Sequence, residues 1–212
     1  MTYGNTRITY PIVPPKAWQE WSFIQRVENG QPIPRFDSGR TVTTLMHTRD
    51  FAKASYGLFL NEAAYGEAVH ITPDATTTWG QVLECVENKL GKKVEVVDMT
   101  QEDIYSAIPF YKGILLGDKG QNMLFDNSKM KQLVPEFRAE ISLQEGVDEM
   151  IDFYNAHPEM KKINYEWNGA IDRLCKSKGY KLSYKYEFPD YKSRLEYYKG
   201  RFPVVGKLAK RL

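Results

Sequence analysis

Three histidines, His47, His70 and His157, are the side chains of this sequence best suited to acid–base chemistry near neutral pH. His47 stands three positions before Asp50 at an expected strand-to-helix junction, where an imidazole and a carboxylate could act as acid and base. The same spacing is typical of a junction hydrogen bond with Asp50 as helix N-cap, which is the more common case. His70 falls in an apolar segment and is expected to be a hydrogen-bonded core residue. His157, followed by Pro158, is expected to end a helix.

Motifs that would complete an active site are missing from the sequence. A dinucleotide-binding loop needs glycines two positions apart, and none of the fifteen glycines has another at i+2. No tyrosine is followed by a lysine at i+4, the pair that could relay a proton. HExxH, GxSxG and CxxC patterns are absent, and the run from Gly200 to Lys207 does not fit a P-loop. We therefore predict no catalytic residue and no metal site in this chain.

Charge is distributed unevenly along the chain. The 212 residues are 42% apolar and 13% aromatic, which suffices for one ordinary domain or two small ones, and the net charge is only +2. From Lys176 onward, however, 11 basic residues face 3 acidic ones. This tyrosine-rich tail could bind RNA or an anionic membrane, in which case binding weakens with salt. More commonly, such rings dock onto the body of the protein.

Cysteine content and hydropathy indicate the compartment. Cys85 and Cys175 lie ninety positions apart and form neither a disulfide framework nor a metal-binding pair. No window approaches the roughly 18 apolar residues of a membrane span, and the first residues lack the apolar region of an export signal. We expect a cytoplasmic protein.

The elements that would position these residues alternate between helices and short strands, which indicates an α/β fold. Threonine or serine followed three residues later by glutamine or glutamate predicts capping boxes at Thr78–Gln81 and Ser142–Glu145. Expected helices cover 15–29, 50–60, 78–90, 101–108, 127–133, 142–157 and 159–175. Expected strands cover 41–46, 68–72, 94–97 and 123–125. The glycine-rich segment 112–122 is expected to be a loop.

Several segments together match a known pattern. They are Thr2-Tyr3-Gly4, 36–39 with 45–54 (LMHTRDFAKA), 66–72 (GEAVHIT) with Thr78-Trp79, 126–135 (DNSKMKQLVP) and 143–147 (LQEGV). In this order they resemble the C-terminal half of an extended short-chain dehydrogenase/reductase, the NAD-dependent epimerase/dehydratase family. The resemblance covers about residues 2–157, three quarters of the chain.

The resemblance implies a fold and a function. Residues 1–157 would form the last strands of a Rossmann-type sheet plus a mixed α/β substrate-binding lobe, and 158–212 a helical, basic, tyrosine-rich extension. The nucleotide-binding half, with its glycine-rich loop and YxxxK pair, would precede Met1. NAD or NADP is the implied cofactor, not bound by this chain alone, and the implied substrate is a sugar, nucleotide sugar or related hydroxylated compound.

The resemblance also implies substrate-binding residues. These are Tyr3, Arg7, Trp18, Thr43, His47, Asp118 and Lys119. Thr43 stands where many nucleotide-sugar epimerases carry an arginine for the diphosphate, which a hydroxyl cannot replace as a clamp. Two hypotheses follow. In the first, the chain is the substrate side of such an enzyme, inactive alone, with a homo-oligomer or a complementing N-terminal half as partner. In the second, it is a non-catalytic binding or scaffold protein whose tail contacts RNA, a membrane or another protein.

Overall fold

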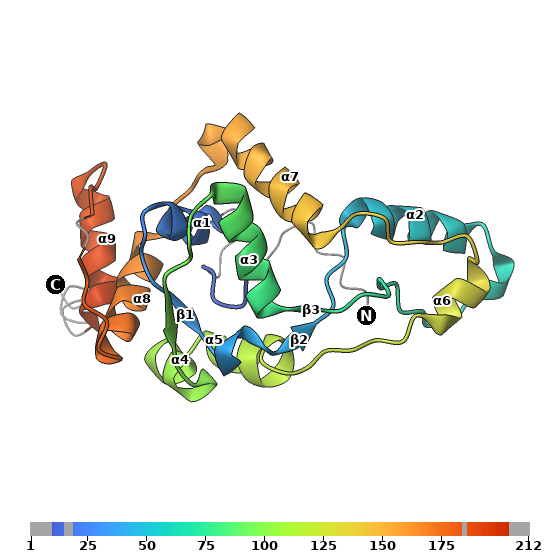
Figure 1. The fold of residues 1–212 in the computed structure, drawn as a ribbon, viewed down its shortest axis with the longest axis horizontal. Helices are drawn as coiled ribbons and strands as arrows, with labels where there is room; N and C mark the ends of the chain where they lie inside the picture. The colour runs from blue at the N-terminus through green and yellow to red at the C-terminus, as the bar shows by residue number, and fades with distance from the viewer. Residues whose placement is uncertain (1–9, 15–18, 184–185, 204–212) are drawn as a thin grey trace.

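A computed structural model describes residues 10–14, 19–183 and 186–203. It shows a broad body that narrows into an outer lobe (Figure 1). The helices are α1 (Trp21–Glu28), α2 (Thr48–Phe59), α3 (Trp79–Leu90), α4 (Gln101–Ala107), α5 (Tyr111–Ile114), α6 (Ser128–Leu133), α7 (Leu143–Ala156), α8 (Tyr165–Ser177) and α9 (Tyr191–Arg201). The strands are β1 (Ile33–Arg35), β2 (Val42–Thr43), β3 (Thr77–Thr78) and β4 (Val96–Asp98). The α/β class predicted from the sequence is confirmed.

The strands form two small sheets. β1 pairs in parallel with β4, with Ile33 opposite Val96 and Arg35 opposite Asp98. β2 pairs antiparallel with β3, with Thr43 opposite Thr77. Parallel pairing of β1 and β4 requires a crossover, and the chain between them includes α3. The β2–β3 pair therefore joins segments about 35 residues apart, and the β1–β4 pair joins residues 63 positions apart.

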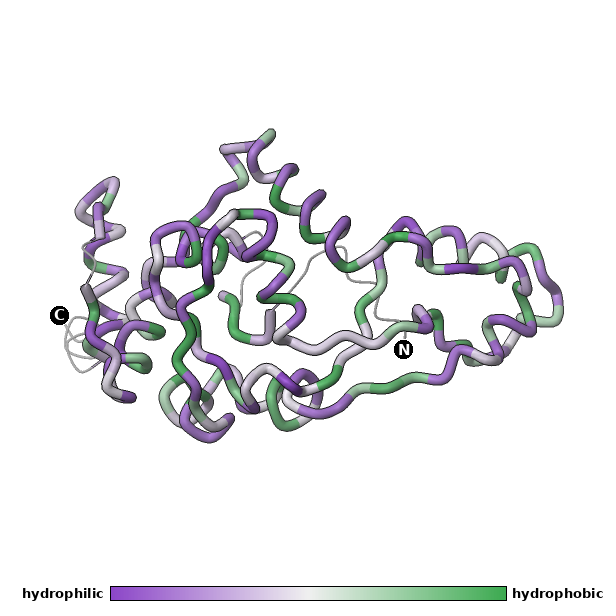
Figure 2. The backbone as a smooth tube through the Cα atoms, viewed as in Figure 1, coloured by the Kyte–Doolittle hydropathy of each residue, from purple (hydrophilic) through white to green (hydrophobic). Residues whose placement is uncertain are grey.

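Helices α3 and α7 begin as the capping boxes predict. The Thr78 hydroxyl accepts a hydrogen bond from the Gln81 amide while the Gln81 side chain accepts one from the Thr78 amide, and Ser142 and Glu145 repeat this exchange. Gly91 ends α3 in a left-handed conformation, φ 62°, which glycine adopts without steric cost. Apolar residues recur at intervals along both helices (Figure 2), so their faces are buried in one core.

The main core joins α1, β1, α3, α7 and α8. Trp21, Ile24, Val86 and Ile151 are almost completely buried there. Ile171 of α8 lies in the same cluster. The segment after residue 158 therefore packs onto the body, whereas the domain boundary itself stays a prediction.

The tail docks through its rings and through two glycines. Tyr186 and Tyr197 turn their hydroxyls toward Arg26 and Asp172 of the body. Helix α9 crosses α8 in close contact, because the backbone of each helix occupies the space that a Cβ would need at Gly169 and Gly200. Aromatic docking, the more common alternative for such a tail, is thus what the described part of the tail does.

We define the outer lobe as α2, residues 60–72 and α6. The outer lobe packs around a second, smaller core. Its buried side chains are Met46, Ala54, Ile71, Met130, Val134 and Phe137. The lobe is tied to the chain entering α7, because one carboxylate oxygen of Asp50 accepts hydrogen bonds from the amides of Glu140 and Ile141, at 3.0 and 2.9 Å.

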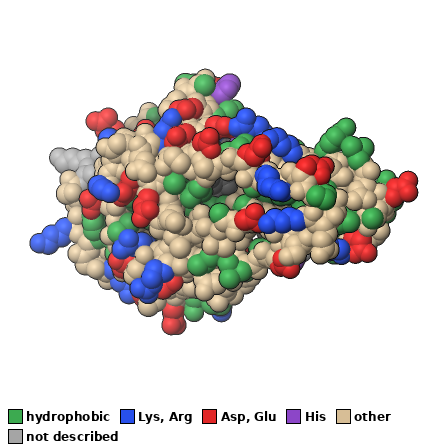
Figure 3. Space-filling view, turned by 45° about the vertical axis from the view of Figure 1, so that its right-hand side comes forward, with side chains coloured by type: hydrophobic (Ala, Val, Ile, Leu, Met, Phe, Trp, Pro, Cys, Tyr) green, Lys and Arg blue, Asp and Glu red, His purple; other side chains and the backbone are tan. Residues whose placement is uncertain are grey.

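Large apolar side chains lie exposed on the outer lobe. Tyr56, Phe59, Leu60 and Tyr65 are each about two-thirds or more exposed, and Figure 3 shows hydrophobic side chains grouped on this end of the molecule. Within the described ranges, none of the helices is long and apolar enough to span a membrane.

Four sequence-based expectations about elements are wrong. Residues 68–72 have no ladder partner and form no strand; Ala68 is exposed. Residues 123–125 are also not a strand, although the Met123 amide donates to the Val42 carbonyl at 3.0 Å. Residues 111–119 form α5 and one π-helical stretch, not a loop, because packing overrides the glycine signal. The helix expected over 159–175 begins only at Tyr165, after a short 3₁₀ turn at Pro158–Met160.

Two further expectations concern helix starts. The N-cap of α2 is His47, not Asp50, because the His47 ring nitrogen Nδ1 accepts the Arg49 amide at 3.2 Å. Asp50 instead lies fully buried in the first turn and holds the 140–141 backbone. The helix expected over 15–29 is described from Trp21 on, and residues 15–18 lie outside the described ranges.

Candidate functional site

Three of the seven predicted substrate-binding residues, Tyr3, Arg7 and Trp18, lie outside the described ranges. The Thr2-Tyr3-Gly4 segment of the resemblance is outside them as well. Their roles stay predictions. The other four, Thr43, His47, Asp118 and Lys119, are described and fall into two places.

Thr43 and Lys119 lie around the small β2–β3 sheet. Thr43 is 8% exposed and pairs with Thr77, so it presents little surface to a ligand. The chain following Lys119 runs along β2, where the Asn122 side chain accepts a hydrogen bond from the Val42 amide at 2.9 Å. The sheet and the segment after the π-helical stretch therefore form one rigid edge.

Trp79, the first residue of α3, fixes Lys119. The indole N–H of Trp79 donates to the Lys119 carbonyl at 2.8 Å, and the Lys119 ammonium lies 5.5 Å from the centre of the Trp79 ring. Burial lowers the pKa of Lys119, and neighbouring Asp118 opposes that shift. A partly desolvated ammonium beside a carboxylate can bind an anionic or hydroxyl oxygen, and the substrate role of Lys119 stays a prediction.

His47 lies at the contact between α2 and α7. Its Nδ1 caps α2 and its Nε2 lies 3.3 Å from a Glu149 carboxylate oxygen of α7. Arg49 pairs with the same Glu149. With Nδ1 accepting, the proton lies on Nε2, so both ring nitrogens of His47 are engaged in structural contacts. The hydrogen bond expected at this strand-to-helix junction is present, but the N-cap is His47 and not Asp50. This structural role explains the position of His47.

The other two histidines are on the surface. His70 is exposed and meets the Phe125 ring edge-on at 5.2 Å, so the expectation that it is a hydrogen-bonded core residue is wrong. His157 is the C-cap residue of α7, as its position before Pro158 predicted. Among the described residues, no three His, Cys, Asp or Glu side chains gather as metal ligands would.

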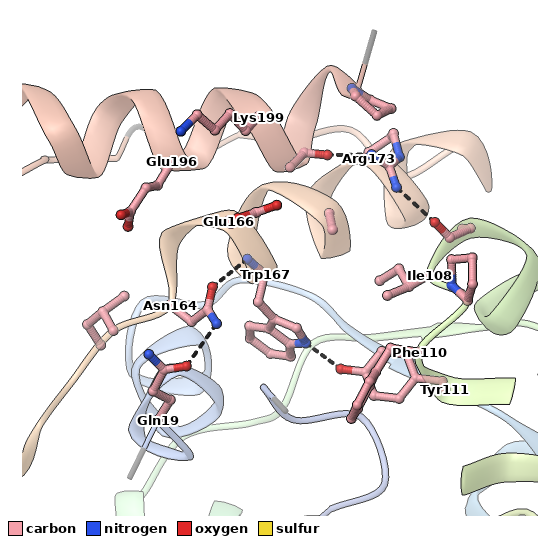
Figure 4. A pocket seen from close by; sticks show the side chains of 16 residues that line it. Gln19, Ile108, Phe110, Tyr111, Asn164, Glu166, Trp167, Arg173, Glu196 and Lys199 are labelled. Atoms are coloured by element: carbon pink, nitrogen blue, oxygen red, sulfur yellow. Dashed lines mark hydrogen bonds between the residues drawn. The ribbon is translucent and has the colours of Figure 1, made fainter. Parts of the chain in front are cut away.

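A pocket of about 510 Å³ opens between α4–α5, α8 and α9 (Figure 4). Trp167 of α8 forms its centre, and its indole N–H donates to the Tyr111 hydroxyl at 2.5 Å. That hydroxyl in turn donates to the Val13 carbonyl at 2.8 Å. Asn164 caps α8 and donates to Gln19 at 2.9 Å. These bonds hold the aromatic and amide groups of the pocket in place.

Charged side chains surround this aromatic centre. Glu166, Glu196 and Lys199 line the pocket from α8 and α9 (Figure 4). Arg173 bridges two helices by donating to the Gly200 carbonyl and, at 2.9 Å, to the Ala107 carbonyl. Ring faces beside carboxylates and amides suit a hydroxylated ring compound, since the rings cover C–H faces and the polar groups bond hydroxyls.

Sequence reasoning did not find this pocket. Among the described residues, none of the predicted site residues lines it. Its members come from four separate segments, and none of those segments carries a recognised motif. The available signal was Trp167, a large aromatic residue within the helix expected over 159–175.

The described residues do not fit the pyrophosphate of a nicotinamide coenzyme. Such a group binds at a helix N-terminus whose backbone amides are available. The first turns of α2, α3, α4, α7, α8 and α9 are each capped by a side chain of the protein. The two short helices have no capping side chain, but the Ser128 amide of α6 donates to the Asp126 carboxylate, and the first two amides of α5 donate to the carbonyls of Ile108 and Pro109. The N-cap residue of α1 is Glu20, whose carboxylate would repel the phosphates.

Comparison with solved structures shows that the described chain matches part of the fold of NAD-dependent epimerase/dehydratase proteins of the extended short-chain dehydrogenase/reductase class. The epimerase Mth375 from Methanothermobacter thermautotrophicus matches with a TM-score of 0.54 at 15% identity, covering 76% of this chain and 42% of that one. UDP-glucuronic acid 4-epimerase from Bacillus cereus in complex with NAD matches with a TM-score of 0.52 at 15% identity, covering 76% and 43%. The same enzyme with UDP-glucuronic acid and NAD gives 0.52 at 17% identity, covering 73% and 43%.

These matches concern the fold. The chain spans less than half the length of the structures it matches. No protein-family model and no curated protein matched the sequence. The predicted structural resemblance to the epimerase/dehydratase class is confirmed, and activity and substrate remain to be proposed.

Proposed function

We propose that this chain is the substrate-side portion, together with the last Rossmann elements, of an NAD(P)-dependent epimerase/dehydratase-like enzyme. The observation that supports the proposal is the structural match, which covers about three quarters of this chain and well under half of each matching enzyme. The motifs quoted above support assigning the matched part to the C-terminal half. The missing glycine-rich loop and YxxxK pair agree with that placement.

The role of this portion is to orient a substrate. In such enzymes the nicotinamide coenzyme carries the difficult chemistry and the protein supplies binding and geometry. Because the first amides of the described helices already donate to groups of the protein or, in α1, follow an acidic N-cap, the coenzyme site belongs to other residues. The chain alone is therefore inactive.

The substrate is a sugar or a related hydroxylated compound. Thr43 offers no guanidinium for a diphosphate, which argues against a nucleotide sugar held as in many epimerases. Lys119, held by Trp79 at the β2–β3 edge, is a cation that can pair with the carboxylate of an acidic sugar.

Calorimetric titration of the purified chain tests the proposal. Glucuronic acid, UDP-glucuronic acid and NAD are titrated separately. We expect glucuronic acid to bind weakly, and we expect this binding to be lost in Lys119→Met. Binding should be retained in Lys112→Met, the matched control, which removes an exposed lysine of α5. We expect no tight binding of NAD. Tight NAD binding, or a complete lack of sugar-acid binding, would contradict the proposal.

The second hypothesis, a non-catalytic binding or scaffold protein, stays a prediction. The same titration distinguishes this hypothesis from the first one, because a scaffold protein needs neither sugar binding nor a coenzyme-bearing partner.

A further inference from the structure

A second cavity, of about 440 Å³, lies in the tail and has aromatic walls. Two helical residues, Arg194 and Arg201, line it together with five rings. The rings are Tyr186, Phe188, Tyr197, Tyr198 and Phe202. Among the described residues, none that lines this cavity is a predicted substrate residue or lines the pocket of Figure 4.

The inner rings are held by the body of the protein. The Tyr197 hydroxyl donates to Asp172 at 2.7 Å, and the Tyr186 hydroxyl donates to Gln31 at 3.2 Å while accepting from Arg26 at 3.0 Å. Because both hydroxyls are engaged away from the cavity, the carbon surfaces of the two rings remain as its lining. Such a preorganised surface binds another planar ring at little entropic cost.

The outer wall combines rings with cations. The Arg194 guanidinium lies 5.7 Å from the centre of the Tyr198 ring, and that of Arg201 lies 5.9 Å from the Phe202 ring. Tyr198 and Phe202 are stacked on each other, with an interplanar angle of 19°. Among the described lining residues, none is acidic. The cavity therefore presents positive charge next to aromatic surface.

One nitrogen of Arg201 has no hydrogen-bond acceptor among the described residues. Its Nη1 is buried and makes no hydrogen bond within the described part of the chain. A buried guanidinium N–H without an acceptor is costly, so such a group calls for a specific explanation. An anionic oxygen near the guanidinium would offset part of that cost, and phosphate is one of the anions that arginine binds in two-point geometry.

We propose that this cavity binds a nucleobase that carries a phosphate. The base stacks on the aromatic lining, and the phosphate contacts Arg194 and Arg201. Stacking on rings tolerates any base, so the site selects the combination of ring and phosphate and not a particular sequence. A free mononucleotide and a single-stranded RNA share this chemistry, and both are included in the test.

Calorimetric titration of the full chain at low salt tests the proposal. The probes are UMP, AMP, inorganic phosphate, adenosine and an eight-nucleotide uridine RNA. We expect either mononucleotide to bind at least about tenfold more tightly than phosphate or adenosine alone, and its affinity to fall as salt rises. RNA that binds no more tightly than UMP identifies a free nucleotide as the ligand, and RNA that binds much more tightly identifies a strand.

Matched variants on α9 distinguish binding in this cavity from non-specific attraction of the ligand to positive charge. Arg194→Gln and Tyr198→Ala remove lining groups, and each should weaken UMP binding by about fivefold or more. Lys192→Gln and Tyr191→Ala remove an exposed cation and an exposed ring of the same helix that do not line the cavity, and should leave binding unchanged. Thermal melting of each variant confirms that it is folded. Equal binding of UMP and phosphate, or equal losses in lining and control variants, would overturn the proposal.

Discussion

Arg26 of α1 and Asp172 of α8 form an ion pair with both side chains fully buried, the guanidinium Nη2 lying 2.7 Å from the carboxylate. The pair is embedded in further bonds. Arg26 also donates to the Pro32 carbonyl at 2.8 Å, and Asp172 accepts from the Tyr197 hydroxyl. One charged contact thus connects the first described helix, the chain entering β1 and the tail helix α9.

Removing one member of this pair should destabilise the protein strongly. Asp172→Asn leaves the Arg26 charge buried without its counter-ion, which typically costs about 3–5 kcal/mol in the free energy of unfolding. The double variant Arg26→Met/Asp172→Leu should recover much of that loss, because apolar residues of similar size need no charge compensation. Urea denaturation measures both. A single variant that loses less than about 1 kcal/mol would show that water reaches the pair.

Helix α9 should detach when the glycine contact with α8 is filled. A Cβ at Gly200 would overlap the Glu166 carbonyl, and one at Gly169 would overlap the Tyr197 carbonyl. We expect Gly200→Ala to lower the free energy of unfolding by about 1–3 kcal/mol, as overpacking does. Gly113→Ala is the matched control, since nothing lies near its Cβ position in α5 and alanine favours helix. Thermal melting that ranks the two variants the other way would refute the close crossing.

The pair between Arg35 and Asp98 should make a small, pH-dependent contribution to stability. Two hydrogen bonds of 2.7 Å join the side chains across the β1–β4 register. The hydrogen bonds from Arg35 lower the pKa of Asp98, so the stabilisation is present above the carboxylate's ordinary pKa of about 4 and is lost as pH falls through the lowered value.

The size of that contribution is limited because the Asp98 side chain is about half exposed. We expect Asp98→Asn to cost about 0.5–1 kcal/mol at pH 7 and almost nothing near pH 2. Glu136→Gln, which neutralises an exposed carboxylate, should show no such change with pH. Denaturation at several pH values gives the comparison, and an Asp98→Asn effect that persists undiminished in acid would contradict this assignment.

The exposed apolar surface of the outer lobe should drive association of the isolated chain. Tyr56, Phe59 and Leu60 are 67%, 75% and 69% exposed at the end of α2. Contiguous apolar surface of this kind usually marks a contact site. We expect concentration-dependent self-association, reduced in Phe59→Ser and unchanged in Phe153→Ser, where an exposed ring lies on α7 instead. Sedimentation velocity that shows a monomer at all concentrations would count against a chain that needs a complementing half.

Local sequence signals predicted the helices well but predicted the pairing of the strands poorly. The capping boxes of α3 and α7 were correct because each depends on residues three apart. The β1–β4 pairing was not foreseen, since its residues are 63 positions apart. The glycines at 113, 117 and 120 indicated a loop, yet Gly120 lies where the Leu115 carbonyl and Gln101 leave no room for a Cβ. There the glycine permits close packing, and the preceding residues remain helical.

The candidate site was predictable only where a resemblance could be followed. The family resemblance selected Lys119, which the structure places over Trp79. The resemblance carried no information on the extension beyond residue 157. The pocket around Trp167 and the aromatic cavity of the tail arise from contacts between segments. Neither has a spacing that a linear pattern could reveal.

The outer lobe has its own small core, separate from the main one, and this division sets the order in which the molecule opens. Among the described residues, the core of the outer lobe contains six buried side chains, whereas the core of the body is a much larger cluster. Partial opening of the smaller unit should therefore cost less than global unfolding. Amide hydrogens of α2 and α6 should exchange with deuterium well before those of α3 and α8, so that this lobe alone can rearrange around an incoming partner.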